Sequence, residues 1–397
     1  MMAAKRVQSL LLALIACFAT VGCWGQQDID RISIVFGIGV DQEGSGQVSV
    51  TAQVVNPPAL RGGSGAGSSS GGGNPTVILT SRGNTVEDAF AGLSNTGWRR
   101  PYYGHTAVAV FGQEYARHGI DQYLDYVERH HQFRKQQLLF VTSETIAELT
   151  GPNQVGVERL TTRAFQEMAR ERSRVSKFPV NSELQVVGDL LSPSHSITLP
   201  VVDPTKTGFS LTGLAVFKGT QAVTVIPERD TEGFMLLRGQ SQGMDVNVPC
   251  PHSPTGNGVR ILNTTTRVHP LQTTTGLKFV VTVRGQAELV RVCSGDRVTP
   301  QFVEQLGQAT SRLLQGKMER AMALLQQNRV DGVQFGNQLF RRNPRLWRQV
   351  ANHWQDTFAT AKVVYDVKVN ILRTGLTLNA PEAVTEPRMD QRIQDWH

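Results

Sequence analysis

The sequence has 397 residues, of which 40% are hydrophobic and 18% charged, and its formal net charge is +7. This composition excludes an intrinsically disordered protein, and the length is sufficient for two or three domains. The basic excess favours contact with anionic lipid headgroups. Nucleic-acid binding is not predicted, because the arginines are scattered along the sequence and their charge is interpreted as that of a solvated surface.

The N-terminus has the layout of a secretory signal peptide. Lys5 and Arg6 precede an apolar run at 10–16, and small residues follow. The apolar segment is shorter than the roughly 20 residues that a membrane-spanning helix needs. Thr20-Val21-Gly22-Cys23 and Leu14-Ile15-Ala16-Cys17 both resemble a bacterial lipobox, in which the cysteine receives a lipid. These residues alone leave Cys23 and Cys17 open as the lipidated position.

The first folded stretch reads as a β-hairpin, with strands at 32–41 and 48–55. It contains Gly37-Ile38-Gly39, which invites a nucleotide-binding interpretation. That fingerprint requires its glycines to open a helix after the strand, whereas here the chain turns into a second strand. We therefore expect the glycines to mark a bulge or a close crossing.

An α/β N-terminal domain is predicted over 23–203, with a flexible Gly/Ser loop at 61–75. Thr85 is the expected start of its first helix, since Glu87 and Asp88 follow in the first turn. Further strands are expected at 76–81, 105–111 and 138–141, and further helices at 113–130, 143–149, 154–173 and 181–191.

The composition then changes, and a small β-rich middle domain is predicted over 204–240 with a turn at Gly219-Thr220. A C-terminal α+β domain is predicted over 241–375, followed by a flexible tail at 376–397. Its expected elements are three strands within 244–293, helices at about 300–328 and 344–358, and a closing strand at 365–371. The predicted fold class is α+β, with three domains whose mixed or antiparallel sheets are flanked by helices.

No combination of residues indicates catalysis or a metal site. His130 and His131 are adjacent at a helix end, Ser192, Ser194 and His195 lack a nucleophile-elbow pattern, and Asp331-Gly332 lacks the other ligands of a calcium loop. Neither a catalytic residue nor a cofactor is predicted.

Two pairs of residues are interpreted structurally. Cys250 and Cys293 have no zinc-site spacing; in an exported protein they could pair in a disulfide, or remain two buried thiols. Trp347 and Trp354 are seven residues apart on one predicted helix face, which is more typical of core packing than of a ligand platform.

Four segments together resemble the C subunits of spore germinant receptors, the Ger(x)C or GerAC-type lipoproteins. The segments are 22–24 with 32–41; 104–106 with 116–120 and 124–129; 214–219; and 331–336 with Trp347, Trp354 and the closing strand. They follow one another along almost the whole chain after the leader. Gly25-Gln26-Gln27 departs from the charged residues that usually follow the tryptophan of the first segment.

The resemblance selects Cys23 over Cys17 as the lipidated residue, carrying N-palmitoyl and S-diacylglycerol groups after removal of a signal peptide at 1–22. It implies a non-enzymatic, lipid-anchored subunit on the outer face of the inner spore membrane. The subunit would act in nutrient-triggered germination with the A and B membrane subunits, and no direct small-molecule site is assigned to it. A solute-binding lipoprotein of a transporter is the alternative; a cell-envelope hydrolase would need a catalytic set.

Overall fold

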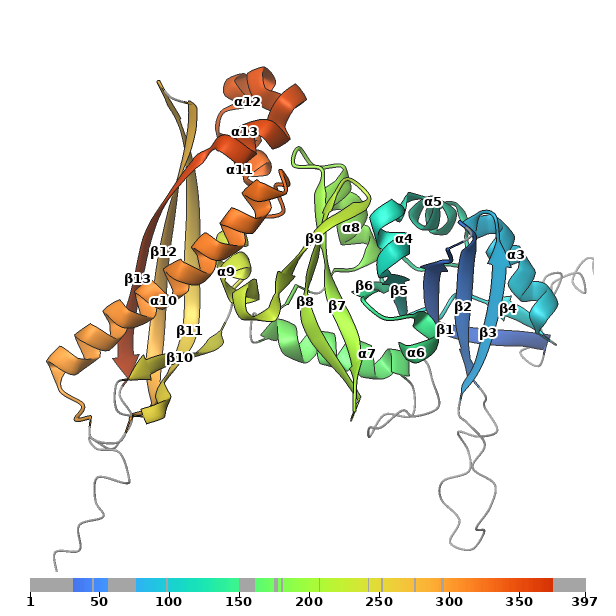
Figure 1. Cartoon of the computed structure of the whole chain (residues 1–397), viewed down its shortest axis with the longest axis horizontal. Helices are drawn as coiled ribbons and strands as arrows, with labels where there is room; N and C mark the ends of the chain where they lie inside the picture. Colours follow the sequence, from blue (N-terminus) through green and yellow to red (C-terminus); the bar gives the residue numbers. More distant parts are fainter. Residues whose placement is uncertain are drawn as a thin grey trace, which may run out of the picture.

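A computed structural model of the chain describes residues 31–373 apart from 45, 56–75, 98, 150–160, 175–177, 180, 207, 242, 251–252, 275 and 294–295. The predicted leader with Cys17 and Cys23, the Gly/Ser loop and the tail at 376–397 lie outside the described residues. The elements form an elongated arrangement of two sheets with their helices (Figure 1).

The first sheet has nine strands in the order β3-β2-β1-β5-β6-β7-β8-β9, with β4 paired to β1. Its centre is parallel, because β1, β5, β6 and β7 run in one direction, and antiparallel strands flank it on both sides. The strands are β1 (Ile32–Gln42), β2 (Val48–Val55), β3 (Thr76–Gly83), β4 (Arg100–Tyr102), β5 (Val108–Gly112), β6 (Leu138–Thr142), β7 (Ser196–Thr205), β8 (Gly208–Lys218) and β9 (Gln221–Pro227).

Helices cover both faces of this sheet. Val108 and Val110 of β5 pack into one apolar cluster, and the alternate residues Ala109 and Phe111 pack into the other. Burial on both faces is the usual condition of parallel strands. The helices are α3 (Val86–Thr96), α4 (Gln113–His118), α5 (Asp121–Arg129), α6 (Ile146–Leu149), α7 (Thr161–Arg174) and α8 (Glu183–Leu190).

Local signals explain where several of these helices begin and end. Thr85 caps α3 as predicted, since its side chain accepts a hydrogen bond from the Asp88 amide. The prediction of a single helix at 113–130 is wrong. The segment is divided into α4 and α5 at Gly119, because its φ of 132° is unsuitable for a helix interior.

The two glycines of β1 have the structural roles that the sequence suggested. The register of the β1–β2 pair shifts between Val35 and Gly37, which is a bulge. A Cβ on Gly39 would lie 2.8 Å from Cγ1 of Ile146, so the residue permits α6 to pack closely against the strand.

The second sheet has four strands in the order β10-β11-β12-β13. β11 and β12 form a long antiparallel hairpin, and β13 runs parallel to β12. The helix α10 crosses this sheet diagonally (Figure 1). The elements are α9 (Glu228–Arg238), β10 (Met244–Cys250), β11 (Ser253–Thr273), β12 (Gly276–Arg291), α10 (Pro300–Gln327), α11 (Phe335–Arg342), α12 (Pro344–Val350), the 3₁₀ helix η2 (Ala351–His353), α13 (Trp354–Thr360) and β13 (Lys362–Arg373).

Two expectations for the second half of the chain need correction. The segment before β10 was expected to have little helix, yet α9 occupies eleven residues. The helix expected at 344–358 is divided into α12, η2 and α13. The mixed α+β class is confirmed, whereas the three-domain division stays a prediction. Its boundary at 203 lies within β7, and β8 and β9 extend the first sheet.

Candidate functional site: a buried junction between the two sheets

A densely hydrogen-bonded cluster of buried polar groups lies where the two sheets meet. One side is the loop between α8 and β7, which contains Ser194. The other side is the segment between α10 and α11, which contains Asp331, together with the start of α13. Ser194 and Asp331 are both 0% exposed. A fully buried carboxylate is costly unless hydrogen bonds compensate for its lost hydration, so its partners define the site.

The Asp331 carboxylate accepts four hydrogen bonds. Its Oδ2 atom accepts from the Ser194 hydroxyl at 2.7 Å, the Gly336 amide at 2.7 Å and the Trp354 indole Nε1 at 3.0 Å. Its Oδ1 atom accepts from the Phe335 amide at 2.9 Å. These donors come from three segments of the chain, so one carboxylate holds the α8–β7 loop, the start of α11 and α13 together.

Two amide side chains complete the junction around the Ser194 backbone. The Ser194 amide donates to Asn337 Oδ1 at 3.0 Å, and Gln355 Nε2 donates to the Ser194 carbonyl at 3.0 Å. Gln355 Oε1 in turn accepts from the Asp331 amide at 3.0 Å. The backbone of Ser194 is therefore bound to the C-terminal half of the chain at both its donor and its acceptor.

Glycine is required at position 336 by the packing of the same groups. A Cβ there would lie 2.8 Å from Trp354 Nε1 and 2.9 Å from Ser194 Oγ, closer than such atoms approach. Gly336 thus lets its own amide and the indole reach the same carboxylate oxygen.

Burial is the largest influence on the acidity of the site. It raises the pKa of Asp331 to about 6, although the bonds from Gly336, Ser194, Phe335 and Trp354 each act to lower it. Ser194 and Asp331 bind one another and are closed to solvent. The arrangement is therefore suited to holding the two sheets together.

A second polar contact is the crossing of α9, which directly follows β9 of the first sheet, with α10, which packs on the second sheet. Arg320 Nε lies 2.7 Å from Asp230 Oδ1, and Lys317 pairs with Glu232. Both carboxylates are almost fully buried. The apolar cluster beneath them includes residues of both sheets, such as Val216 of β8 and Val281 of β12. The two sheets therefore share one core at this crossing.

The cysteines singled out from the sequence have different positions. Cys23 and Cys17 lie outside the described residues. Cys250 and Cys293 are joined in the structure, with their sulfur atoms 2.00 Å apart, and connect the end of β10 to the end of β12.

The remaining residues considered for chemistry do not converge on one common site. His130 and His131 stack on one another at the end of α5, with ring centroids 5.3 Å apart. Ser192 donates to the Asp189 carbonyl, and His195 Nδ1 contacts the Leu190 carbonyl. Trp354 is buried, while Trp347 is half-buried at a centroid distance of 5.2 Å from it.

Two further findings concern the described part of the chain. It contains no group of three or more histidine, cysteine, aspartate or glutamate side chains placed to hold a metal ion. None of its helices combines the length and the apolar character needed to cross a bilayer.

The amino-acid sequence matches two family models in succession. Residues 25–204 match the spore germination protein N-terminal domain, and residues 212–375 match the spore germination B3/GerAC-like C-terminal domain. The first match ends within β7 and the second begins within β8, so the first sheet contains residues from both.

Relatives and a solved structure extend the match to whole chains. Spore germination protein KC of Bacillus subtilis (strain 168) is 22% identical over 94% of this chain and 98% of its own. Spore germination protein B3 of the same organism is 20% identical over 90% of this chain and 95% of its own. The crystal structure of the GerBC protein has the same fold, with a TM-score of 0.53 and 17% identity over 87% of this chain and all of its own. The chain belongs to the Ger(x)C family of spore germination proteins, the GerAC-type C subunits of germinant receptors.

Proposed function

We propose that this chain is a lipid-anchored, non-enzymatic subunit of a nutrient germinant receptor, attached through Cys23 to the outer face of the inner spore membrane. It would act in assembly or signal relay with the A and B membrane subunits. The observation that carries the proposal is the position of the family match, which begins at residue 25, two positions after Cys23. Arg31 lies eight positions after Cys23, a reach of at most about 29 Å, so the anchor would keep the folded body close to the bilayer.

The junction supports a role based on rigid connection. Ser194, Asp331 and Trp354 hold one another in a closed set of hydrogen bonds between the two sheets. A force or displacement applied to one sheet is therefore transmitted to the other through fixed contacts. The alternative, a solute-binding lipoprotein of a transporter, typically has two similar lobes around a cleft. Here the sheets have nine and four strands, and their connection order differs.

The anchor is tested by replacing each candidate cysteine. Cys23→Ala should move the protein from the membrane to the soluble fraction of spore lysates and impair germination, because the lost diacylglycerol supplies most of the attachment. Cys17→Ala is the matched control and should leave both properties unchanged. Membrane-bound Cys23→Ala protein that still incorporates labelled palmitate would contradict the proposal. Co-purification of the A and B subunits with the detergent-solubilised chain tests the partners separately.

A further inference from the structure

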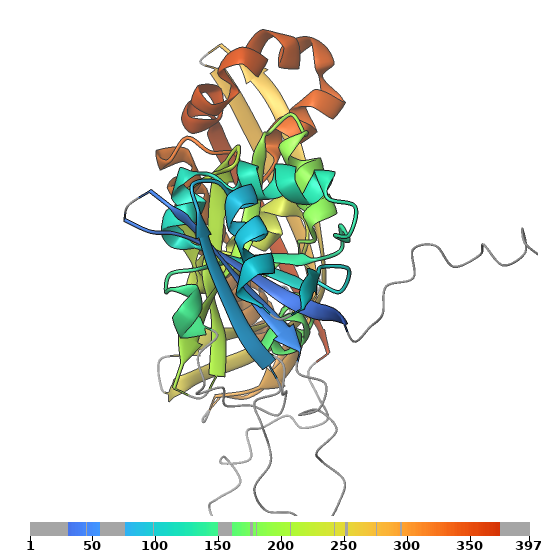
Figure 2. The ribbon, with the colours of Figure 1, turned by 90° about the vertical axis from the view of Figure 1, so that its right-hand side faces the viewer.

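An exposed surface at the end of the C-terminal sheet combines arginine with aromatic side chains. We call it the basic tip; it consists of α11, α12 and the adjoining end of the β11–β12 hairpin. Figure 2 shows these elements rising above the nine-stranded sheet. The exposed residues that define the basic tip are Arg267, His269, Leu271, Phe340, Arg341, Arg342, Arg345 and Arg348.

Positive charge at the basic tip is not balanced by nearby carboxylates. Residues 332–355 and 262–283 contain no aspartate or glutamate. The ion pairs found in the described part of the chain involve none of Arg341, Arg342, Arg345 and Arg348. Of the two carboxylates that flank residues 332–355, Asp331 is fully buried and accepts the four hydrogen bonds of the junction, and Asp356 is paired with Arg329 at 3.1 Å. The expectation of scattered arginines is therefore wrong for this surface.

An exposed aromatic side chain directly precedes the two arginines of α11. Phe340 is 46% exposed, and its ring packs edge-to-face on Trp347 at 6.4 Å between centroids. Trp347 in turn contacts the buried Trp354. Leu271, at the hairpin end, is 40% exposed, and Arg342 donates to His269 Nδ1 at 3.2 Å, which fastens α11 to the hairpin. An aromatic residue flanked by cations is the pattern that proteins use at membrane interfaces.

We propose that the basic tip binds the headgroups of an anionic phospholipid bilayer, independently of the lipid anchor. The charge complementarity is direct, since arginines without acidic partners gain from a negative headgroup layer. The elements project from the end of the domain (Figure 1), and a headgroup layer can adapt to such a convex end. The basic tip belongs to the C-terminal sheet and its helices, whereas β1 belongs to the nine-stranded sheet, so the tip and the anchor would contact the membrane through different parts of the molecule (Figure 1).

The test uses the chain from Trp24 onward, which retains every described residue and carries no lipid. It should float with vesicles of phosphatidylglycerol and phosphatidylcholine, but not with phosphatidylcholine alone. Replacing Arg341, Arg342, Arg345 and Arg348 together by alanine should weaken binding at least about tenfold, and raised salt should have the same effect. Phe340→Ser should weaken it further at equal charge.

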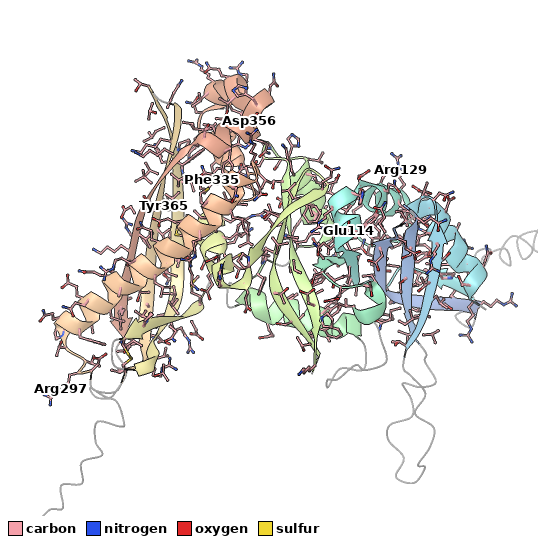
Figure 3. The ribbon with its side chains drawn as sticks, in the orientation of Figure 1. Glu114, Arg129, Arg297, Phe335, Asp356 and Tyr365 are labelled. Carbon is pink, nitrogen blue, oxygen red and sulfur yellow. A yellow bond between two sulfur atoms is a disulfide. The ribbon has the colours of Figure 1, made fainter. Side chains whose placement is uncertain are left out.

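Two control variants separate the basic tip from net charge and from arginine-specific contacts. The first control removes the same charge elsewhere, by alanine at Arg99, Arg134, Arg297 and Arg312. Vesicle binding should stay within about twofold, because screened charges act only over a short range. Arg297, for example, lies at the other end of the C-terminal sheet from the basic tip (Figure 3). The second control places lysine at the four tip positions, which keeps the charge and should retain vesicle binding. If the tip instead bound carboxylates of a protein partner through bidentate arginine contacts, lysine would weaken that binding.

Unchanged vesicle binding of the alanine variant at the tip, or no preference for anionic vesicles, overturns the proposal. Cross-linking of the basic tip to another receptor subunit without vesicle binding also overturns it, in favour of an acidic protein partner. Because the assayed chain has no anchor, these outcomes do not bear on the attachment through Cys23. Thermal unfolding of each variant confirms that it is folded before its binding is interpreted.

Discussion

The indole Nε1 of Trp354 donates a 3.0 Å hydrogen bond to Oδ2 of Asp331, and both side chains are buried. This bond connects the packing of α13 with the carboxylate that also holds Ser194 of the other half. Trp354 thus has two roles, since its ring fills the C-terminal core beside Phe279 and Phe358 while its nitrogen stabilises the junction.

Replacing Trp354 separates these two roles. Trp354→Ala should lower the free energy of unfolding by roughly 3–5 kcal/mol, because a large buried ring is removed. Trp354→Phe keeps most of the packing and should cost about 1–3 kcal/mol, because the buried carboxylate loses one donor. Urea unfolding of the chain from Trp24 onward measures both, with Trp347→Phe as a half-buried control.

The same variants distinguish packing from ligand binding in spores. We expect Trp354→Ala to reduce the amount of receptor without changing which nutrient is sensed. A variant with normal unfolding and an altered nutrient preference would show that the tryptophan contacts a ligand.

The closing strand β13 could be predicted from the sequence and α9 could not, for a physical reason. The alternation of Tyr365, Val367, Val369 and Ile371 follows from one face of β13 packing on α10, so the pattern is visible in the sequence. α9 was missed because residues 230–237 are all buried, and a helix buried on all sides has no polar face to give it a period.

The junction could not be predicted from the residues that form it. Ser194 and Asp331 are distant in sequence, and the residues around each indicate nothing about the other. Their contact depends on how α9, α10 and the two sheets pack, which no local pattern contains. Nothing in the local sequence distinguishes Ser194, because Ser192, His195 and Ser196 around it are polar as well.

Gly233 should be essential at the crossing of α9 and α10. A Cβ there would overlap the Lys317 backbone and lie 2.6 Å from the Met318 amide nitrogen, and a helix backbone cannot move aside locally. Gly233→Ala should therefore lower the free energy of unfolding by about 1–3 kcal/mol through overpacking.

Gly316 provides the matched control on the partner helix. A Cβ at Gly316 would meet only a flexible arginine side-chain atom, Arg320 Nη1 at 3.5 Å. Gly316→Ala should raise stability by about 0.5–1 kcal/mol, since alanine is the better helix former. Equal effects of the two substitutions in thermal unfolding would contradict the close helix crossing.

We propose that the disulfide between Cys250 and Cys293 forms in the exported protein. It closes a loop with a sequence separation of 43, which should stabilise the folded state by roughly 3–4 kcal/mol. A reductant should lower the melting temperature of the chain from Trp24 onward, and should have no effect on the Cys250→Ser, Cys293→Ser double variant. Two thiols that react on unfolding without reductant would show that the cysteines are unpaired.

Glu183 should make the folded protein less stable as the pH rises. Its carboxyl is fully buried at the start of α8 and accepts a 2.5 Å hydrogen bond from Gln137 Nε2. Burial raises the pKa of Glu183 from 4.5 to about 7; the Glu128 charge raises it further, whereas the Gln137 bond and Lys135 oppose the change. The folded protein therefore holds this proton more tightly than the unfolded chain does.

This contribution to stability is fully present below pH 4.5 and is lost as pH rises through 7. Glu183→Gln keeps the shape and the bond to Gln137 but cannot ionise. The stability of the variant relative to the original protein should increase between pH 4.5 and 8, by up to about 3 kcal/mol. Glu114→Gln, which removes an exposed carboxylate 2.7 Å from Arg117, is the control for the loss of one negative charge (Figure 3). Urea unfolding at half-unit pH intervals measures the difference, and parallel curves for Glu183→Gln and the original protein would show that Glu183 ionises alike in the folded and unfolded chains.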